Sequence, residues 1–188
     1  MAELIGKRYA QALFEVGVEL EKLEDFRDEI VFIAQAFKEE PKLYTIIQHP
    51  KVSKTEKRDI IDSIFKDRVS EEISNLLYIL IDKDREKSLQ DISDEYVNLY
   101  NEKFNIVDAQ AYTAVEMNED AKLKLQEKLS KKLDKKVNLV NIVDKDIIGG
   151  VLVKIKDKVI DESIRKQLEM LGKNLQSVRV TKKEVKNS

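Results

Sequence analysis

The amino-acid sequence predicts an α+β protein, in which an N-terminal six-helix bundle is followed by a small β-α-β-β-α domain. Apolar residues recur at spacings of three and four through the first hundred residues, which is the period of one helix face. Near Asn105 the period changes to two, which is typical of strands. We therefore expect a helical domain at residues 1–105, a small α/β domain at 106–180 and a polar tail at 181–188.

The two halves of the chain also differ in charge. Residues 1–105 carry 16 basic and 23 acidic side chains, a charge of −7, whereas residues 106–188 carry 18 and 13, a charge of +5. Such an asymmetry favours two domains with different partners.

Prolines and caps divide the helical half. The residues that precede Pro41 and Pro50 are pushed out of the helical region, so helices are expected to end there. The segment "SKTE" at Ser53–Glu56 predicts a capping box that begins a helix. Ser70 and Asp84 are predicted to cap the two helices that follow. The helix before Pro41 has one apolar face, formed by Leu23, Phe26, Ile30, Ile33 and Phe37.

The second half alternates strands and helices. The segment Val107–Val115 alternates with period two and predicts a strand, after which Asn118 is expected to cap a helix. The β-branched segments Val137–Val143 and Val151–Ile155 predict two further strands. A last amphipathic helix is predicted from the spacing of Ile164, Leu168, Leu171 and Leu175.

The adjacent glycines Gly149 and Gly150 raise the question of a phosphate-binding loop. A dinucleotide loop needs spaced glycines between a strand and a helix, and a Walker loop needs a lysine followed by Ser or Thr. Here the glycines precede "VLVKIKD", which has the pattern of a strand. They are interpreted as a tight turn between two strands, because glycine tolerates a positive φ. Asp161 or Ser163 would then cap the last helix.

The composition excludes several classes of protein. A chain that is 42% hydrophobic and 37% charged is typical of a globular protein with a highly charged surface. It contains no cysteine, which excludes disulfides, thiol nucleophiles and cysteine-ligated metals. No apolar run reaches the ~18–20 residues of a membrane span, and we expect no signal peptide.

No set of residues predicts chemistry. The one histidine, His49, precedes Pro50 in a predicted loop and has no cysteines with which to bind zinc. Carboxylates are abundant, and the sequence selects no pair of them as a catalytic site. The basic run Lys128–Val137 lacks aromatic residues and is interpreted as a solvated helix face rather than a nucleic-acid surface. We predict no catalytic, cofactor-binding or metal-binding residue.

Two helices carry more apolar surface than one core needs. In the first helix, two adjacent stripes are formed by Ile5, Tyr9, Ala12 and Val16 and by Ala10, Leu13, Phe14 and Gly17. Together these stripes span roughly twice the ~100° arc of a surface helix. In the helix after Ser70, Asn75 and Ile79 lie beside the expected core face. An apolar arc this wide indicates either that the helix is buried at the centre of the protein or that it has a second apolar surface for a partner. Two such helices favour a groove that binds a partner.

Three segments carry a resemblance to a known family. They are "RYAQALFEVG", "NLLYILIDKDR" and "VDKDIIGGVLVKIKDKVIDESIRKQLEML". In order and spacing they resemble the delta subunit of bacterial F-type ATP synthase, whose mitochondrial counterpart is the oligomycin-sensitivity-conferral protein. The resemblance covers almost the whole chain, and its third segment is the most specific. Residues after about Lys182 fall outside it.

The resemblance implies a non-catalytic peripheral-stalk (stator) subunit of an F-type proton-translocating ATP synthase. Its N-terminal domain would bind the N-terminal helix of an alpha subunit, and its C-terminal domain would bind the C-terminal coiled coil of the b subunits. The stator would resist the torque of the rotor, so that proton flow drives ATP synthesis. The chain would lie at the cytoplasmic face of the cell membrane, which it would reach only through the complex, and it would bind neither cofactor nor nucleic acid.

The family also implies a site. Its groove for the alpha helix lies between helices one and five, and the matching positions here are Tyr9, Ala12, Asn75 and Ile79. These residues belong to the wide apolar arcs. A helix-binding adaptor unrelated to ATP synthase is the alternative, and it would share the arcs but not the C-terminal motif. A nucleotide-handling enzyme would need a phosphate-binding loop, which the sequence lacks.

Overall fold

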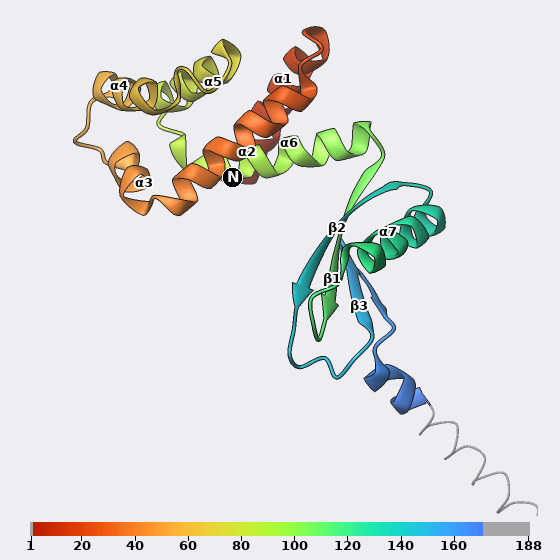
Figure 1. The fold of residues 1–188 in the computed structure, drawn as a ribbon. Coiled ribbons are helices and arrows are strands. Elements are labelled where there is room, and N and C mark those ends of the chain that lie inside the picture. Colours follow the sequence, from red (N-terminus) through yellow and green to blue (C-terminus); the bar gives the residue numbers. More distant parts are fainter. Residues whose placement is uncertain (1, 171–188) are drawn as a thin grey trace, which may run out of the picture. The chain divides into compact units, whose positions relative to one another are not determined.

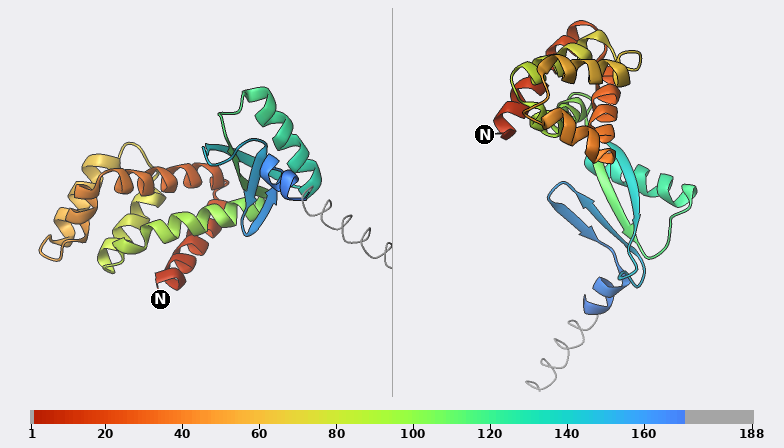
Figure 2. Two further views of the ribbon diagram at one scale, coloured as in Figure 1. Left: turned by 90° about the horizontal axis from the view of Figure 1, so that it is seen from below. Right: turned by 90° about the vertical axis from the view of Figure 1, so that its left-hand side faces the viewer.

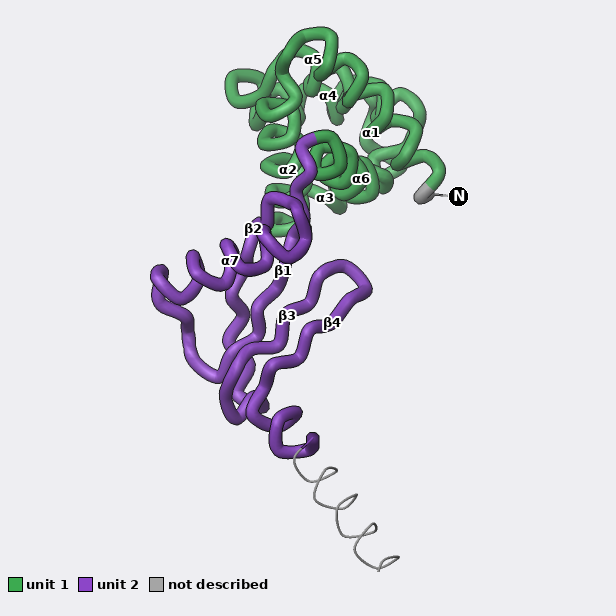
Figure 3. Tube along the Cα trace, turned by 90° about the vertical axis from the view of Figure 1, so that its right-hand side faces the viewer, with its two compact units in different colours: residues 1–103 green, residues 104–188 purple. Residues whose placement is uncertain are grey.

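Helices make up the first of two units in the computed structural model, which describes residues 2–170 (Figures 1 and 3). This unit comprises residues 1–103, and residues 104–188 form the second. In the described part, the helices of the first unit are α1 (Ala2–Glu19), α2 (Leu23–Glu39), α3 (Pro41–Gln48), α4 (Lys54–Phe65), α5 (Glu71–Asp82), the 3-10 helix η1 (Glu86–Ser88) and α6 (Leu89–Lys103).

The core of the first unit is built around α6. Tyr96 of α6 is fully buried, and its hydroxyl donates to the carbonyl oxygen of Leu23 at 3.2 Å. Its ring meets that of Phe14 edge to face, with centroids 5.9 Å apart, and burial raises the pKa of the phenol. α1 approaches α6 closely through glycine, since a Cβ at Gly6 would lie 2.8 Å from the Cβ of Asp91. This packing fixes which face of α1 is covered.

Two of the helix starts predicted in the first unit take the expected position. Ser53 begins α4 with a capping box, in which its hydroxyl accepts from the amide of Glu56 at 3.2 Å and Glu56 accepts from the amide of Ser53 at 2.8 Å. Ser70 lies at the N-cap of α5, but its hydroxyl donates to Glu29 at 2.6 Å instead of capping the helix. The hydrogen bond from Ser70 to Glu29 joins α5 to α2.

The predicted cap at Asp84 is wrong. Asp84 has a φ of 53° and lies between α5 and η1, so α6 begins only at Leu89. Its carboxylate instead accepts from the ammonium of Lys54 at 3.0 Å. Aspartate tolerates this left-handed conformation better than most residues, which allows the chain to turn here.

Replacing Ser53 by alanine is expected to lower the free energy of unfolding by about 1 kcal/mol, because the first amides of α4 lose their acceptor. Ser63→Ala is the matched control in the same helix, since the Ser63 hydroxyl donates only to the carbonyl of Ile60 and alanine favours a helix. Chemical unfolding followed by circular dichroism measures both. Equal midpoints for the two variants would contradict a stabilising cap.

The second unit is a four-stranded sheet with α7 (Glu119–Leu133) packed against one of its faces (Figure 2). The strands are β1 (Ile106–Thr113), β2 (Lys136–Val143), β3 (Val151–Ile155) and β4 (Lys158–Asp161), in the order β2-β1-β3-β4. β1 is parallel to β2, which α7 makes possible as the crossover, and antiparallel to β3. As predicted, Asn118 caps α7 by accepting from the amide of Ala121 at 2.8 Å.

The core of the second unit lies between α7 and the sheet. Neighbouring strands place their apolar residues in register on one face, where Ala109 is paired with Leu139 and Ala111 with Val153. Leu129 of α7 is buried against this face. Lys128, Lys131 and Lys132 are exposed, which agrees with a solvated helix face for the basic run.

Two expectations for the second unit are corrected. The predicted order β-α-β-β-α lacks one strand, since β4 follows β3 before the last helix. In addition, the glycines lie at the end of a loop between β2 and β3, which are not neighbours because β1 lies between them. Gly150 has the expected positive φ of 81°, but the loop crosses the end of β1 and is not a tight hairpin turn. Leu171, Leu175 and the tail at 181–188 lie outside the described residues.

Candidate partner-binding surface

The first helix divides its wide apolar arc between the core and the surface. Ala10 and Leu13 are buried in the core of the first unit. Ala12 is exposed, Val16 is 38% exposed, and Tyr9 is partly buried at the edge of the core. One stripe of α1 therefore remains available after the unit has folded.

The fifth helix shows the same division. Five of its apolar residues are buried, and they are Ile73, Leu76, Leu77, Leu80 and Ile81. Ile79 is 46% exposed, and Asn75, one turn earlier, is also exposed. An apolar side chain of this size at the surface of a well-packed helix is not needed for the fold, so it can contribute to binding.

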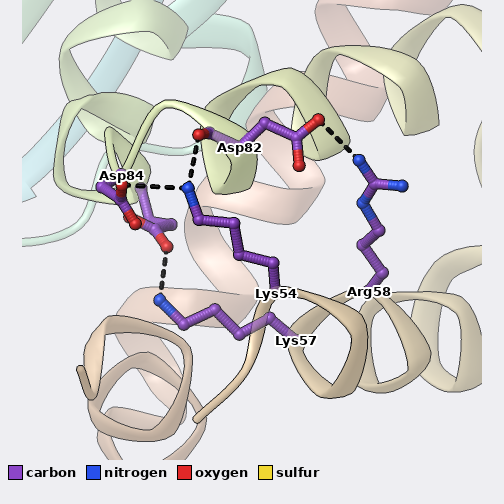
Figure 4. Close-up of polar contacts among 6 residues, drawn as sticks. Lys54, Lys57, Arg58, Asp82 and Asp84 are labelled. Atoms are coloured by element: carbon purple, nitrogen blue, oxygen red, sulfur yellow. Dashed lines mark hydrogen bonds and ion pairs between the residues drawn. The ribbon is translucent and has the colours of Figure 1, made fainter. Parts of the chain in front are cut away.

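Polar contacts occupy the side of α5 that faces α4 (Figure 4). Arg58 of α4 pairs with Asp82 of α5 at 2.5 Å, and its guanidinium lies 5.4 Å from the ring centroid of Tyr78. The Tyr78 hydroxyl donates to Asp62, and this hydrogen bond raises the pKa of the phenol. These contacts bind α4 to α5, and they involve neither Asn75 nor Ile79.

Two polar contacts set the relative direction of α1 and α5. The ammonium of Lys22, shortly after α1, pairs with Glu72 in the first turn of α5 at 3.2 Å. Arg85, shortly after α5, donates to the hydroxyl of Tyr9 at 3.0 Å. The early part of α1 therefore lies near the end of α5, and the two helices run in opposite directions. The four residues implied by the family all lie within the segments bounded by these two contacts.

These segments have the length of a short helical ligand. Residues 9–22 and 72–85 each extend over about 20 Å at 1.5 Å per residue. The backbone amide of Glu72 and the ammonium of Lys22 hold the pKa of the Glu72 carboxyl below its ordinary value, so this end of the surface carries an ion pair without net charge. Arg85 contributes positive charge at the other end.

Arg85 contacts the candidate surface, and the sequence did not predict it. Its guanidinium also lies 5.8 Å from the ring centroid of Tyr9, so it holds that side chain by two kinds of contact. The two residues are 76 positions apart in the sequence. No local pattern could have predicted their contact.

Two hollows of the first unit do not lie at this surface. A groove of about 760 Å³ runs between α2 and α6, and its lining includes Val31, Gln35 and Val97. A second hollow of about 620 Å³ adjoins it and includes Phe37 and Tyr44. α1 presents exposed apolar side chains and α5 presents Ile79, a surface that suits a helical ligand rather than a small molecule.

The described residues include no cluster that could hold a metal ion. His49 is exposed, and its Nδ1 accepts from the amide of Lys51 at 3.2 Å. Among residues 2–170, no three carboxylate or histidine side chains come together as possible metal ligands. None of the described helices is long and apolar enough to cross a membrane.

Comparison with known proteins identifies the family. The model of the ATP synthase delta (OSCP) subunit family matches residues 5–175. The chain belongs to this family of non-catalytic subunits of ATP synthase. It is a peripheral-stalk (stator) subunit of an F-type ATP synthase, which decides against an unrelated helix-binding adaptor.

Relatives match over nearly their full length. The ATP synthase subunit delta of Alkaliphilus oremlandii is 46% identical over 180 residues, which cover 96% of this chain and 100% of that protein. The corresponding protein of Clostridioides difficile is 37% identical, with 95% and 99% covered. A sodium ion specific delta subunit from Propionigenium modestum is 34% identical, with 90% and 97% covered.

A solved structure shows the same fold. A chain in the cryo-EM structure of the Toxoplasma gondii mitochondrial ATP synthase hexamer superimposes with a TM-score of 0.70. The match covers 91% of this chain and 97% of that chain at 19% sequence identity. At 19% identity this likeness shows that the two chains share the α+β fold.

Proposed function

We propose that residues 1–105 act as a six-helix bundle that binds the N-terminal helix of an ATP synthase alpha subunit. The contact surface consists of Tyr9 and Ala12 on α1 and Asn75 and Ile79 on α5. The observation that carries the proposal is that both helices keep exposed apolar side chains after their core faces are buried: Ala12 and Val16 on α1, and Ile79 on α5. Family membership supports the choice of partner.

The chemistry of these exposed side chains suits an amphipathic helix. Ala12 is small, so a partner helix can approach the backbone of α1 closely at that point. Ile79 and Val16 supply apolar surface, and Asn75 offers a donor and an acceptor. A short helix is marginal in water by itself, so the alpha segment gains order when its apolar face is covered.

The C-terminal domain, residues 106–180, binds the C-terminal coiled coil of the b subunits in this proposal. Support comes from the helical residues 164–170, where Ile164 is 43% exposed, Leu168 59% and Met170 51%. A helix so exposed in an otherwise packed unit is suited to a helical partner. The protein thereby links the catalytic head to the stalk, and it lies at the cytoplasmic face of the membrane through the complex alone.

Affinity purification of the tagged chain at its native level tests this assignment. We expect the alpha and b subunits to be recovered together with the chain. A chain that lacks residues 1–105 should lose the alpha subunit, and one that ends before residue 106 should lose b. Recovery of both partners by either truncated chain would contradict the division of roles.

Ile79→Ala is expected to weaken binding of an alpha N-terminal peptide by about 5- to 150-fold, which corresponds to ~1–3 kcal/mol for a buried aliphatic side chain. Ile46→Ala is the matched control, because Ile46 on α3 is 45% exposed and Ile79 is 46% exposed. Calorimetric titration of the peptide into both variants gives the affinities. If the two variants bind equally, Ile79 is not in the contact surface.

A further inference from the structure

The loop that contains Gly149 and Gly150 contacts the start of the last helix. The amide of Ile164 donates to the carbonyl oxygen of Gly149 at 2.9 Å. Two residues earlier, the amide of Glu162 donates to the carbonyl oxygen of Val151 at 3.0 Å. The segment between β4 and the helix is therefore held by backbone hydrogen bonds against residues 149–151.

Only glycine allows this approach at position 150. A Cβ there would lie 2.5 Å from the carbonyl oxygen of Glu162 and 2.9 Å from the Cα of Ser163. The φ of Gly150 is +81°, which other residues rarely adopt. Both obstacles are backbone atoms, so a side chain at this position would push the start of the helix away from the loop.

Position 149 is restricted in a different way. A Cβ there would lie 2.7 Å from Cδ1 of Ile164, and that methyl group ends a flexible side chain. Alanine at this position would therefore displace the side chain of Ile164 rather than the backbone. The two glycines thus control the position of the helix start and of its first apolar residue.

Ser163 caps the last helix and attaches its first turn to β4. It is buried, its hydroxyl accepts from the amide of Lys166 at 3.2 Å, and its own amide donates to Asp161 at 3.0 Å. These contacts cap the helix, and the hydrogen bonds to Asp161 hold the pKa of that carboxyl below its ordinary value. The first turn is attached both to β4 and to the glycine loop.

We infer that Gly149 and Gly150 are positioning residues for the stalk interface: Gly150 sets the direction in which the last helix leaves the sheet, and Gly149 leaves room for the side chain of Ile164. The inference rests on the proposed function of the C-terminal domain. In the described part of this helix, Ile164 and Leu168 lie four residues apart on one face and are 43% and 59% exposed. Exposed apolar side chains at this spacing suit contact with a helix, so the partner is a helix of the b subunit.

Spin labels on the full-length chain test the positioning. The chain contains no cysteine, so Lys132→Cys on α7 and Gln167→Cys on the last helix provide two unique label sites. In the parent chain we expect one narrow distance distribution. Gly150→Ala should shift or broaden it, because the start of the helix is pushed away from the loop, whereas Gly149→Ala should leave it nearly unchanged, because only the side chain of Ile164 is displaced. Ile148→Ala is the control, because Ile148 is in the same loop and is 73% exposed.

A double-mutant cycle connects positioning with binding. Titration of a peptide from the C-terminal part of the b stalk should show that Gly149→Ala weakens binding about tenfold in the parent chain. In an Ile164→Ala background the same change should have little effect, because the side chain it displaces has been shortened. Gly149→Ala keeps the test decisive even if Gly150→Ala prevents folding.

The possible failures can be distinguished. If the parent chain does not bind the b peptide, the proposed function of the C-terminal domain fails. If the parent chain binds but both glycine variants keep its distance distribution and its affinity, the positioning inference is overturned. Changed distances with unchanged affinity also overturn it, since the direction of the helix would then not matter for the interface.

Discussion

Replacing Lys57 by methionine is expected to destabilise the first unit by about 3–5 kcal/mol, because it leaves Glu86 as an unpaired buried charge. Lys57 Nζ lies 2.7 Å from Glu86 Oε1, and the two side chains are only 6% and 10% exposed. Figure 4 shows the lysine reaching from α4 toward the turn after α5. This ion pair joins α4 to η1 at a point where water cannot replace a lost partner.

The neighbouring pair provides the control. Lys54 and Asp84 form the same kind of contact at 3.0 Å, but their side chains are 46% and 71% exposed. Lys54→Met should therefore cost only about 0–1 kcal/mol. The double variant Lys57→Met with Glu86→Leu should recover most of the lost stability, because no buried charge remains.

Chemical unfolding of the full-length chain, followed by helical circular dichroism, measures these differences. Most of the helical residues belong to the first unit, so this signal reports mainly on it. If Lys57→Met costs no more than Lys54→Met, the pair does not have the structural role assigned to it. The same result would follow if solvent reached Glu86 freely.

Ala12→Asp is expected to weaken binding of the alpha N-terminal peptide by more than about 100-fold, since a carboxylate would be enclosed against an apolar helix without a partner. Ala12 is exposed in the free chain, so the variant should fold normally. Ala121→Asp is the matched control, because it makes the same change on an exposed surface of α7 in the other unit.

Two measurements on each variant decide the outcome. Calorimetric titration gives the affinity, and unfolding curves show whether the first unit is intact. If Ala12→Asp binds as tightly as the parent chain, the alpha helix binds to a different surface, and the groove between α2 and α6 becomes the next to test. If the variant unfolds, Ala12 belongs to the core and the argument from exposed apolar side chains fails.

Local patterns were sufficient for much of the fold. The capping box at Ser53 and the cap at Asn118 involve residues three positions apart, so the sequence shows both partners together. The change of period near Asn105 is also local, and the second unit begins at residue 104. The resemblance in "VDKDIIGG" and the segment after it was equally visible, and it is confirmed by the family match.

The exposed apolar side chains were predictable for a related reason. An apolar arc wider than one core needs is a property of a single helix, and it can be read from spacing alone. Which half of the arc becomes the surface depends on neighbours. Gly6 allows α1 to pack closely along α6, and this contact buries Ala10 and leaves Ala12 exposed.

By itself, then, the sequence determined the class of the main helices and strands, the caps at Ser53 and Asn118 and the family of the protein. Only the tertiary structure decided the strand order β2-β1-β3-β4, the existence of the short strand β4 and the contacts of Lys57 with Glu86 and of Arg85 with Tyr9. β4 has four residues and exists through its pairing with β3, so it lacks a periodic signal of its own. The two polar contacts join residues 29 and 76 positions apart, and such partners are chosen by the packing of helices rather than by local spacing.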